Sequence, residues 1–269
     1  MGRRASEGLN VAITETTNSA ALEDPAERWF PWREPNPRAN VRLLCLPFSG
    51  GVALNYRAWS RMLPQADVCA VELPGHGTRR REPLIADMSI LVQQLLDVVR
   101  RLPDRPLVVF GHSLGAFVGF DLVQAMVESG MPEPRCLVVS AALAPDDRKQ
   151  ESVYGERTDD ETIERLRRLD GTPKEVLENE ELMALSLPVI RADYRLIKTR
   201  RQPPYTLLSC PLVGFCGADD PLVSPSDMIG WQQRSSRSCS TRVFPGRHFY
   251  VHQDSAAPLE EIARLLRPV

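Results

Sequence analysis

The 269-residue sequence contains no uninterrupted apolar run that approaches the length of a membrane-spanning helix. Such a helix needs about 18 or more consecutive apolar residues. The first twenty residues, MGRRASEGLNVAITETTNSA, also hold no apolar block of the kind found at the centre of a signal peptide. We therefore expect a cytoplasmic protein with no membrane partner.

The sequence carries little net charge and no metal-binding cysteine motif. A formal charge of −2 provides no basic field that would attract nucleic acid. The six cysteines include no Cys-x-x-Cys pair, and most lie in or beside apolar, strand-like runs (Cys45, Cys69, Cys136, Cys210 and Cys216). Cysteines in such places are typical of a reduced core, so we expect neither disulfides nor a metal site.

The chain is long enough for one large domain, preceded by a polar extension. Residues 1–38 are polar and contain several prolines, and they end in WFPWREPNPRAN. This composition predicts a largely disordered tail that leads into an extended segment, in which Trp29, Phe30 and Trp32 pack on the domain. The domain itself is predicted to cover residues 39–269.

Within the domain, short apolar runs alternate with helical patterns. The runs that predict strands cover residues 41–47, 67–74, 106–110, 135–143, 210–217 and 240–246. The segments that predict helices cover residues 56–63, 89–102, 114–130, 224–235 and 258–267. Apolar strands that alternate with helices are typical of an α/β fold with a mostly parallel central sheet flanked by helices.

This alternation breaks between residues 145 and 204. The stretch holds three helical patterns, in residues 158–171, 172–180 and 181–200, and no predicted strand. Thr158 and Glu161 match a capping box at the start of the first of these helices. We interpret residues 145–204 as an inserted helical lid; the alternative is a set of ordinary covering helices.

The pentapeptide from Gly111 to Gly115, GHSLG, lies between a predicted strand and a predicted helix. Gly-x-Ser-x-Gly alone is a weak signal, since chance produces it in about one chain of this length in ten. Here it has the strand-turn-helix context of a nucleophile elbow, a turn so tight that both glycines must lack side chains. Such an elbow holds the serine hydroxyl at the carboxyl end of the sheet, where ligands bind in α/β folds. Ser113 is therefore the candidate nucleophile.

A serine nucleophile needs a base, and the sequence has only four histidines. His112 is adjacent to the serine in the tight turn and points away from it, so we expect it to support the elbow. His76 is expected in a solvated turn, with a place at the rim of the cleft as the alternative, and His252 is expected at the surface. His248 follows the last predicted strand and precedes the C-terminal helix, from where its ring can reach over the sheet edge. We therefore predict His248 as the base.

The base needs an orienting carboxylate, and the oxyanion needs two backbone N–H groups. The turn in CPLVGFCGADDPLVS supplies Asp219 and Asp220, in the Ser, Asp, His order of α/β-hydrolases. One N–H group is expected from Leu114, at the start of the helix. The other is expected from the loop LCLPFSGG, where we favour Phe48 over Ser49.

Seven separated motifs together resemble one known family. They are LCLPFSGG, ELPGHGTRR, FGHSLGAF, LPVIRADYRLI, GADDPLVS, a following helix that bears Trp231, and FPGRHFYV. In this order, over residues 28–268, they resemble the discrete type II thioesterases of polyketide and nonribosomal peptide assembly lines, which belong to the α/β-hydrolase superfamily. They are also similar to the chain-terminating thioesterase II of fatty acid synthesis. The sequence departs from the family at Ser49 and Arg247, where alanine and glycine are usual.

The resemblance implies a site and a reaction. It assigns the nucleophile to Ser113 and the base to His248, and its Gly-x-x-Asp turn, which starts at Gly217, selects Asp220 as the acid. It implies an editing enzyme that hydrolyses acyl groups from the phosphopantetheine arm of an acyl or peptidyl carrier protein, through an acyl-enzyme. The protein itself would need no cofactor and no metal, because the substrate carries the phosphopantetheine. The carrier protein would bind transiently to a monomeric enzyme.

Further residues are expected around the substrate and the carrier protein. Ser49 and His112 lie beside the predicted oxyanion loop and nucleophile and are expected to contact substrate. In the lid, candidate lining residues are Leu185, Leu187, Val189 and Ile190, for which a core role is equally consistent. Carrier proteins are usually acidic, so two basic groups are docking candidates, with a solvated face as the alternative: Arg79, Arg80 and Arg81, or Arg195, Lys198, Arg200 and Arg201.

Two other functions fit the same motifs. A small-molecule carboxylesterase or an acyltransferase shares the fold and the triad, and differs in its rate on acyl-carrier protein compared with a simple aryl ester. A catalytically inactive hydrolase that serves as a scaffold is disfavoured, because Ser113, Asp220 and His248 are all present.

Overall fold

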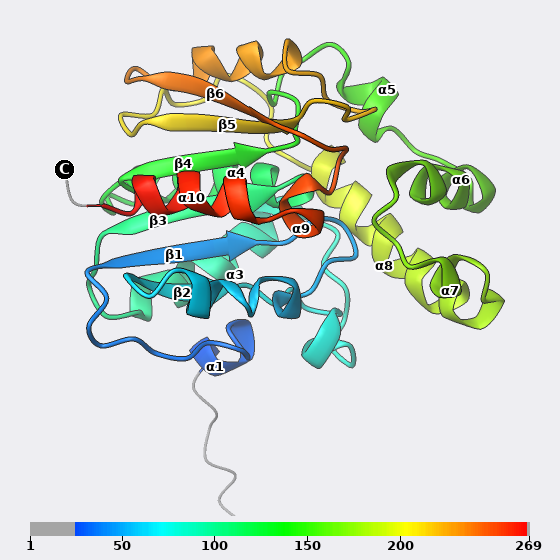
Figure 1. The fold of residues 1–269 in the computed structure, drawn as a ribbon, viewed down its shortest axis with the longest axis horizontal. Helices are drawn as coiled ribbons and strands as arrows, with labels where there is room; N and C mark the ends of the chain where they lie inside the picture. Colours follow the sequence, from blue (N-terminus) through cyan, green and yellow to red (C-terminus); the bar gives the residue numbers. More distant parts are fainter. Residues whose placement is uncertain (1–24, 268–269) are drawn as a thin grey trace, which may run out of the picture.

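The computed structural model describes residues 25–267, which form a central sheet covered by helices on both faces (Figure 1). The sheet has six strands in the order β2-β1-β3-β4-β5-β6, and every neighbouring pair is parallel. The strands are β1 (Val41–Leu46), β2 (Ala66–Ala70), β3 (Leu107–His112), β4 (Cys136–Ser140), β5 (Leu212–Gly217) and β6 (Cys239–Phe244). Each overlaps a segment predicted as a strand, and the predicted α/β fold with a parallel sheet is confirmed.

The two faces of the sheet have different helical covers. One face packs against α1 (Pro25–Trp29), α3 (Met88–Arg101), α4 (Leu114–Glu128) and the 3-10 helix η3 (Asp227–Arg234). The other packs against η1 (Ala53–Tyr56), α2 (Trp59–Met62), α9 (Tyr250–Gln253) and α10 (Ala256–Leu265). Within β1, Leu44 and Leu46 face the first cover, whereas Leu43 and Cys45 face the second. Burial on both faces explains why the strands are unbroken apolar runs in the sequence.

The start of the described chain differs from the prediction. The sequence predicts a disordered tail up to the segment that begins at Trp29, but residues Pro25–Trp29 form the helix α1. Trp29 and Phe30 are buried in the core, as expected, and the Arg79 guanidinium lies 4.3 Å from the centroid of the Trp29 ring. Trp32 is partly buried and packs against the core on the other face of the sheet, also as expected. Residues 1–24 of the predicted tail lie outside the described residues.

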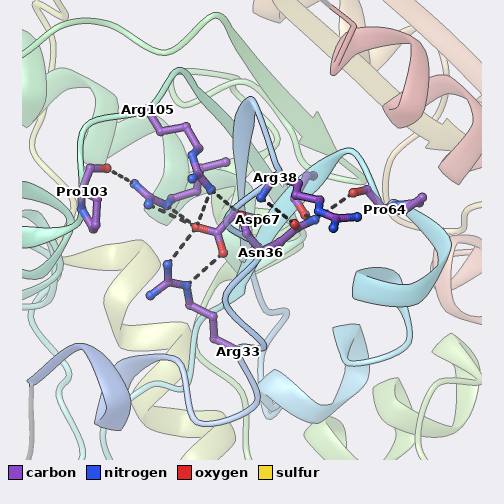
Figure 2. Close-up of polar contacts among 9 residues, drawn as sticks. Arg33, Asn36, Arg38, Pro64, Asp67, Pro103 and Arg105 are labelled. Carbon is purple, nitrogen blue, oxygen red and sulfur yellow. Dashed lines mark hydrogen bonds and ion pairs between the residues drawn. The ribbon is translucent and has the colours of Figure 1, made fainter.

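A buried carboxylate at the amino end of the sheet ties four segments together (Figure 2). The side chain of Asp67 in β2 is 0% exposed and accepts hydrogen bonds from Arg33 Nε at 3.0 Å and Nη2 at 2.9 Å. Arg42 Nε of β1 donates to it at 3.2 Å, and Arg105 Nη1, just before β3, lies 3.3 Å away. We call this group of four residues the Asp67 clamp; it joins the segment after α1 to the starts of β1, β2 and β3.

Between β4 and β5 the chain forms four helices. They are α5 (Gln150–Tyr154), α6 (Asp159–Leu169), α7 (Lys174–Leu177) and α8 (Glu180–Lys198). Figure 1 shows α6 and α7 beyond the end of the sheet to which the strand arrows point. Helix α6 begins with the predicted capping box, in which Thr158 and Glu161 bond each other's backbone N–H groups. We keep the name lid for residues 145–204.

Helix α8 belongs to two hydrophobic clusters. Met183, Leu187 and Ile190 pack with Leu166 of α6 in a small lid cluster. Further along the same helix, Leu196 and Ile197 pack in the main core. Pro188 lies inside the helix and cannot donate a backbone hydrogen bond to the carbonyl four residues earlier. Helix α8 therefore connects the lid to the body of the domain, with one helical hydrogen bond missing in its first half.

Three further observations concern residues 25–267. No helix among them is long and apolar enough to cross a bilayer, and no three of their side chains form a cluster that could hold a metal ion. All six cysteines have free thiols, and five of them are buried. Burial raises the pKa of the Cys69, Cys136 and Cys210 thiols to about 12, so they stay protonated at neutral pH.

Candidate active site

Ser113 lies in a tight turn between β3 and α4. Its backbone has φ 54° and ψ −114°, and a positive φ is uncommon for any residue other than glycine. A Cβ atom on Gly111 would lie 2.1 Å from the carbonyl oxygen of Gly115, and one on Gly115 would lie 2.2 Å from that of Leu46. Both glycines are therefore required, as the sequence predicts for a nucleophile elbow.

His248 and Asp220 meet at the carboxyl ends of β5 and β6. Nδ1 of His248 lies 2.8 Å from Oδ2 of Asp220, and both side chains are buried. The other carboxylate oxygen accepts the N–H groups of Leu222 at 2.8 Å and Val223 at 3.3 Å. Because a carboxylate only accepts hydrogen bonds, Nδ1 is the protonated ring nitrogen. Asp219, the neighbouring candidate, is exposed.

A glycine allows the acid loop and the histidine loop to cross. A Cβ atom on Gly217, the last residue of β5, would lie 2.4 Å from the carbonyl oxygen of Arg247 and 2.6 Å from that of Gly246. The Asp219 N–H also donates to the Gly246 carbonyl at 3.0 Å. Gly217 therefore both starts the acid turn and lets the loop of His248 pass against it, and only the first role is visible in the sequence.

Ser113 and His248 line one small cavity beneath the lid. Its volume of about 20 Å³ has room for about one water molecule. Within residues 25–267, the His248 ring bonds Asp220 and makes no hydrogen bond to the Ser113 hydroxyl. Catalytic hydrogen bonds often tighten only when substrate is bound. The cavity is also lined by Phe48, Ser49, Leu114, Tyr154, Arg165, Leu166, Leu169, Ile190, Tyr194, Ile197, Leu222 and Phe249.

The two predicted oxyanion donors lie around this cavity. Leu114 is the first residue of α4, where a backbone N–H has no partner within the helix. Phe48 begins a turn that is closed by a 2.8 Å hydrogen bond from the Gly51 N–H to the Phe48 carbonyl. Ser49 also lines the cavity, and its buried hydroxyl has no hydrogen-bond partner in the described part of the chain. Both predicted donor residues therefore lie at the cavity in which an oxyanion at Ser113 would form.

The four lid residues predicted to line the substrate site have different surroundings. Ile190 does line the cavity. Leu187 packs inside the lid cluster, and Val189 is partly buried away from the cavity. Leu185 is 72% exposed, so in this arrangement it contacts no part of the cavity. These differences follow from helix geometry, because residues at successive positions of α8 point in different directions.

His112 lies beneath the cavity and does not line it. Its side chain is 0% exposed, and Nδ1 lies 2.8 Å from the Ser140 hydroxyl, which is 2.6 Å from the hydroxyl of Tyr250. Burial, with a further contribution from His248, holds the pKa of His112 well below its usual range. The expectation that His112 contacts substrate is therefore wrong for this structure, whereas its expected role as a support of the elbow is consistent with these contacts.

His252 is partly buried and its ring packs inward, whereas the sequence predicts a surface position. Its ring centroid lies 5.1 Å from that of Phe48, 5.2 Å from that of Tyr56 and 5.5 Å from that of His112. Burial lowers the pKa of His252 to about 4, so the ring is neutral at physiological pH and packs as an aromatic group. Its spacing from His248 gives no sign of this inward orientation.

Several lid residues that line the cavity were not predicted. The main ones are Tyr154, Arg165, Leu166, Leu169 and Tyr194. Their helices are recognisable in the sequence, but helical spacing alone does not tell which face meets the cavity. The weak signal available was the presence of aromatic and basic residues in a segment already interpreted as a lid.

Two of the proposed docking cations have internal partners. Arg79 is buried and donates to Glu82 at 2.9 and 2.7 Å. Arg200 is buried and forms a bidentate pair with Asp121 at 2.8 and 2.7 Å. These two residues therefore stabilise the fold and are not docking residues. The exposed members of the two groups are Arg80, Arg81, Arg195, Lys198 and Arg201.

Comparison with known proteins gives a consistent result. A family model described as "Thioesterase domain" matches residues 41–268. The probable cadicidin biosynthesis thioesterase of Streptomyces griseus is 36% identical over 247 residues, which cover 91% of this chain and 68% of that protein. The gramicidin S biosynthesis protein GrsT of Aneurinibacillus migulanus is 30% identical over 243 residues, covering 90% and 95%. The solved structure of the type II thioesterase BorB from the borrelidin biosynthetic cluster aligns with a TM-score of 0.77 and 37% identity, over 88% of this chain and 96% of that chain.

The matched region contains the whole candidate site. Residues 41–268 include the elbow, the acid turn, the histidine loop and the lid. The resemblance to type II thioesterases, predicted from seven separated motifs, is confirmed. By sequence and by structure, the chain belongs to the thioesterase family and is a hydrolase that acts on thioesters.

Proposed function

We propose that the protein removes stalled or wrong acyl groups from acyl or peptidyl carrier proteins, by hydrolysing the thioester on their phosphopantetheine arm. The observation that carries the proposal is the 2.8 Å contact between His248 and Asp220, beside a strained Ser113 that lines the same cavity. Similarity to proteins named for cadicidin, gramicidin S and borrelidin biosynthesis supports an assembly-line substrate.

In the proposed mechanism, Ser113 is the nucleophile, His248 the base and Asp220 the orienting acid. Nε2 of His248 takes the proton of the Ser113 hydroxyl while the hydroxyl oxygen attacks the thioester carbonyl. Asp220 accepts the Nδ1–H, which leaves Nε2 free to take that proton, and it stabilises the cation that results. The N–H groups of Phe48 and Leu114 donate to the oxyanion.

The oxyanion then collapses and the bond between the acyl carbon and sulfur breaks. His248 returns its proton to the leaving sulfur, and the acyl group stays on Ser113 as an ester. A thiol with a pKa of about 8.5 leaves readily, so protonation of the leaving group matters less than it does in amide cleavage. A water molecule, deprotonated by His248, attacks the ester carbon, and the free acid leaves as Ser113 regains its proton.

The lid must move before an acyl group can reach Ser113. A cavity of about 20 Å³ has room for about one water molecule and cannot accept an acyl chain. The lid cluster of Leu166, Met183, Leu187 and Ile190 is separate from the main core. Helices α6 and α7 and the first half of α8 can therefore shift outward and widen the cavity around the acyl chain, while the core of the domain stays intact.

Mass spectrometry of loaded carrier proteins tests this proposal. Carrier protein charged with acetyl, hexanoyl or malonyl groups is incubated with wild-type enzyme or with the Ser113→Ala variant. We expect loss of acyl groups and a transient acyl-enzyme mass with wild type, and neither with the variant. Full activity of Ser113→Ala would remove Ser113 from the mechanism. A kcat/KM on 4-nitrophenyl hexanoate equal to that on acyl-carrier protein would indicate a general carboxylesterase instead.

A further inference from the structure

A second buried histidine–carboxylate pair lies behind the predicted oxyanion loop. Asp193 of α8 is 1% exposed, and His76, in the loop after β2, is 4% exposed. The prediction that His76 lies in a solvated turn is therefore wrong, because α8 covers the turn. Nε2 of His76 lies 3.1 Å from Oδ2 of Asp193. The same oxygen accepts the Gly50 N–H at 2.6 Å. One carboxylate oxygen thus joins the lid helix, the loop after β1 and the loop after β2.

The contacts of His76 are those of a charged ring. Its Nδ1 lies 3.1 Å from the Pro74 carbonyl oxygen, so both ring nitrogens face acceptors, and a ring that donates from both nitrogens is an imidazolium. Burial lowers the pKa of His76, but the charge and hydrogen bond of Asp193 outweigh it and raise the pKa above its usual value. In the described part of the chain, Glu72 also faces His76, and burial raises the pKa of the Glu72 carboxyl. Arg79 in turn donates to the Glu72 backbone carbonyl at 3.0 Å.

Gly50 is the point where the loop meets the lid helix. It has φ +73°, and a Cβ atom there would lie 3.5 Å from Cγ1 of Ile190, one helical turn before Asp193. Ile190 packs in the lid cluster and also lines the active-site cavity. The contact between Asp193 and Gly50 therefore lies one helical turn from the lid cluster, where α8 meets the loop that carries Phe48.

We propose that Asp193 and His76 form a latch that holds the oxyanion loop, residues 47–51, in its working position while the lid opens. Asp193 is a positioning residue: it does not line the cavity, and it acts through Gly50 on the Phe48 backbone two residues earlier. The latch keeps the second half of α8 attached to the body, so that α6, α7 and the first half of α8 move alone. This inference rests on the proposed function, because it requires Phe48 as an oxyanion donor.

Two substitutions at one position test the latch. Asp193→Asn keeps an acceptor of the same shape and removes the charge, whereas Asp193→Leu removes both. We expect kcat on an acyl-N-acetylcysteamine thioester to fall about tenfold in Asp193→Asn. We expect a fall of about a hundredfold or more in Asp193→Leu, with KM little changed in both. Glu181→Gln removes a negative charge from an exposed position on the same helix and is the matched control, for which kcat should be unchanged.

A pH profile separates a charged latch from a simple packing contact. Because the latch requires a protonated His76, kcat should fall as the pH rises through the pKa of His76 and the ring loses its proton. His76→Gln, whose amide can donate to Asp193 but does not titrate, should lack this alkaline loss, and so should Asp193→Asn.

The results that would overturn the latch are specific. Asp193→Asn with a wild-type kcat and a wild-type pH profile overturns it, as does a rise in KM with kcat unchanged. If Ser113→Ala is inactive while Asp193→Asn is fully active, only the latch fails. If Ser113→Ala remains active, the proposed function itself fails.

A different observation concerns Arg165 of α6. It lines the cavity together with Ser113 and His248, and its Nε and Nη2 atoms are buried without a hydrogen-bond partner in the described part of the chain. The guanidinium lies 5.6 Å from the centroid of the Tyr194 ring. Buried N–H groups almost always have hydrogen-bond acceptors. Two unpartnered N–H groups on a residue that lines the substrate cavity therefore indicate that the substrate supplies the acceptor.

We infer that Arg165 receives a carbonyl or carboxylate oxygen on the acyl chain, so that oxygenated acyl groups are preferred to plain alkyl ones. The phosphate of the phosphopantetheine arm is not the occupant, because it lies at the opposite end of the arm from the thioester, whereas Arg165 shares a cavity with Ser113. This inference also rests on the proposed function.

Paired thioesters test the role of Arg165. The kcat/KM values of 3-oxohexanoyl- and 5-oxohexanoyl-N-acetylcysteamine are compared with that of the hexanoyl compound. We expect wild type to prefer at least one oxo compound and Arg165→Met to lower that preference about tenfold, with Arg165→Lys in between. Arg167→Met, on the exposed face of the same helix, should keep the wild-type preference. A wild-type preference for hexanoyl, or an unchanged ratio in Arg165→Met, overturns the inference. Ser113→Ala tests the proposed function separately, because it should abolish hydrolysis of all three compounds.

Discussion

The two ends of the sheet surround their buried carboxylates differently. At the amino end, Asp67 contacts three arginines, whereas at the carboxyl end Asp220 and Asp193 each contact one histidine. A guanidinium keeps its charge over the whole pH range in which proteins fold, whereas an imidazole gains and loses a proton near neutrality. The amino end is therefore suited to holding segments together, and the carboxyl end to handling protons.

Buried polar atoms without partners are also distributed unevenly. In the described part of the chain, those near the site include Ser49 Oγ, Glu72 Oε2, His112 Nε2, Asp193 Oδ1 and two nitrogens of Arg165. At the amino end, Arg42 Nη2 makes no hydrogen bond but lies 3.1 Å from an oxygen of Asp67. Buried polar groups usually pair, and exceptions need an explanation. Of these residues, Ser49 and Arg165 line the cavity, so bound substrate can supply partners for their atoms.

The largest expected effect on kcat comes from a substitution at the carboxyl end of the sheet that removes the acid of the site. Asp220→Asn should lower kcat by about four orders of magnitude, because an amide does not hold His248 in the required tautomer. Asp219→Asn, at the exposed neighbouring position, should leave kcat unchanged. Steady-state kinetics on an acyl-N-acetylcysteamine thioester measures both. Equal losses in the two variants would contradict the assignment of the acid.

Removal of the carboxylate at the amino end of the sheet should lower the free energy of unfolding and leave kcat unchanged. Asp67→Ala should lower the free energy of unfolding by about 3–5 kcal/mol, because three guanidinium groups lose their shared partner. At temperatures where the variant is folded, kcat should match wild type. Urea denaturation measures the change, and Asp97→Ala, an exposed position on α3, is the control, with an effect below about 1 kcal/mol. A normal stability with a reduced kcat would reverse the roles assigned to the two ends.

The two ends of the sheet should contribute to the pH dependence of stability in opposite directions: the amino end loses stability in acid, and the carboxyl end loses it in alkali. Burial raises the pKa of Asp67, but hydrogen bonds and charges from Arg33 and Arg42 outweigh it and lower that pKa below its ordinary value of 3.8. The stabilisation from Asp67 is therefore complete above pH 3.8 and is lost as the pH falls through the folded-state pKa. The pKa of His76 is raised above 6.5, so its stabilisation is complete below that pH and is lost as the pH rises through the folded-state value.

Urea titrations at a series of pH values measure both effects. Asp67→Ala should remove part of the acid-side loss of stability, and His76→Gln part of the alkaline-side loss. If both variants change the stability on the same side of neutral pH, the two ends of the sheet do not differ in the way described.

The catalytic constellation could be predicted because local sequence determines most of it. A turn that needs glycine on both sides of a serine leaves a signature within five residues, and the supply of only four histidines made elimination practical. The residues alone left two adjacent aspartates open, and only the family resemblance selected Asp220. The structure agrees with that selection, since Asp220 bonds the His248 ring while Asp219 is exposed.

The parts that could not be predicted depend on tertiary packing. The contact between His76 and Asp193 joins residues 117 positions apart, and nothing in either motif indicates the other. The same holds for His252, which a short helix turns toward Phe48 and Tyr56, and for Leu185, whose exposure depends on the rotation of α8. Helical spacing identifies an apolar face but not which neighbour will cover it.

The left-handed backbone of Ser113 sets a limit on the stability of the active protein. A non-glycine residue with such a φ stores about 1–3 kcal/mol of strain, which persists only because the surrounding structure imposes it. Alanine would keep this strain, since it has a Cβ atom, whereas glycine would release it. A chain with glycine at this position would lack a nucleophile and be harder to unfold. The elbow is therefore a place where selection for activity and selection for stability favour different residues.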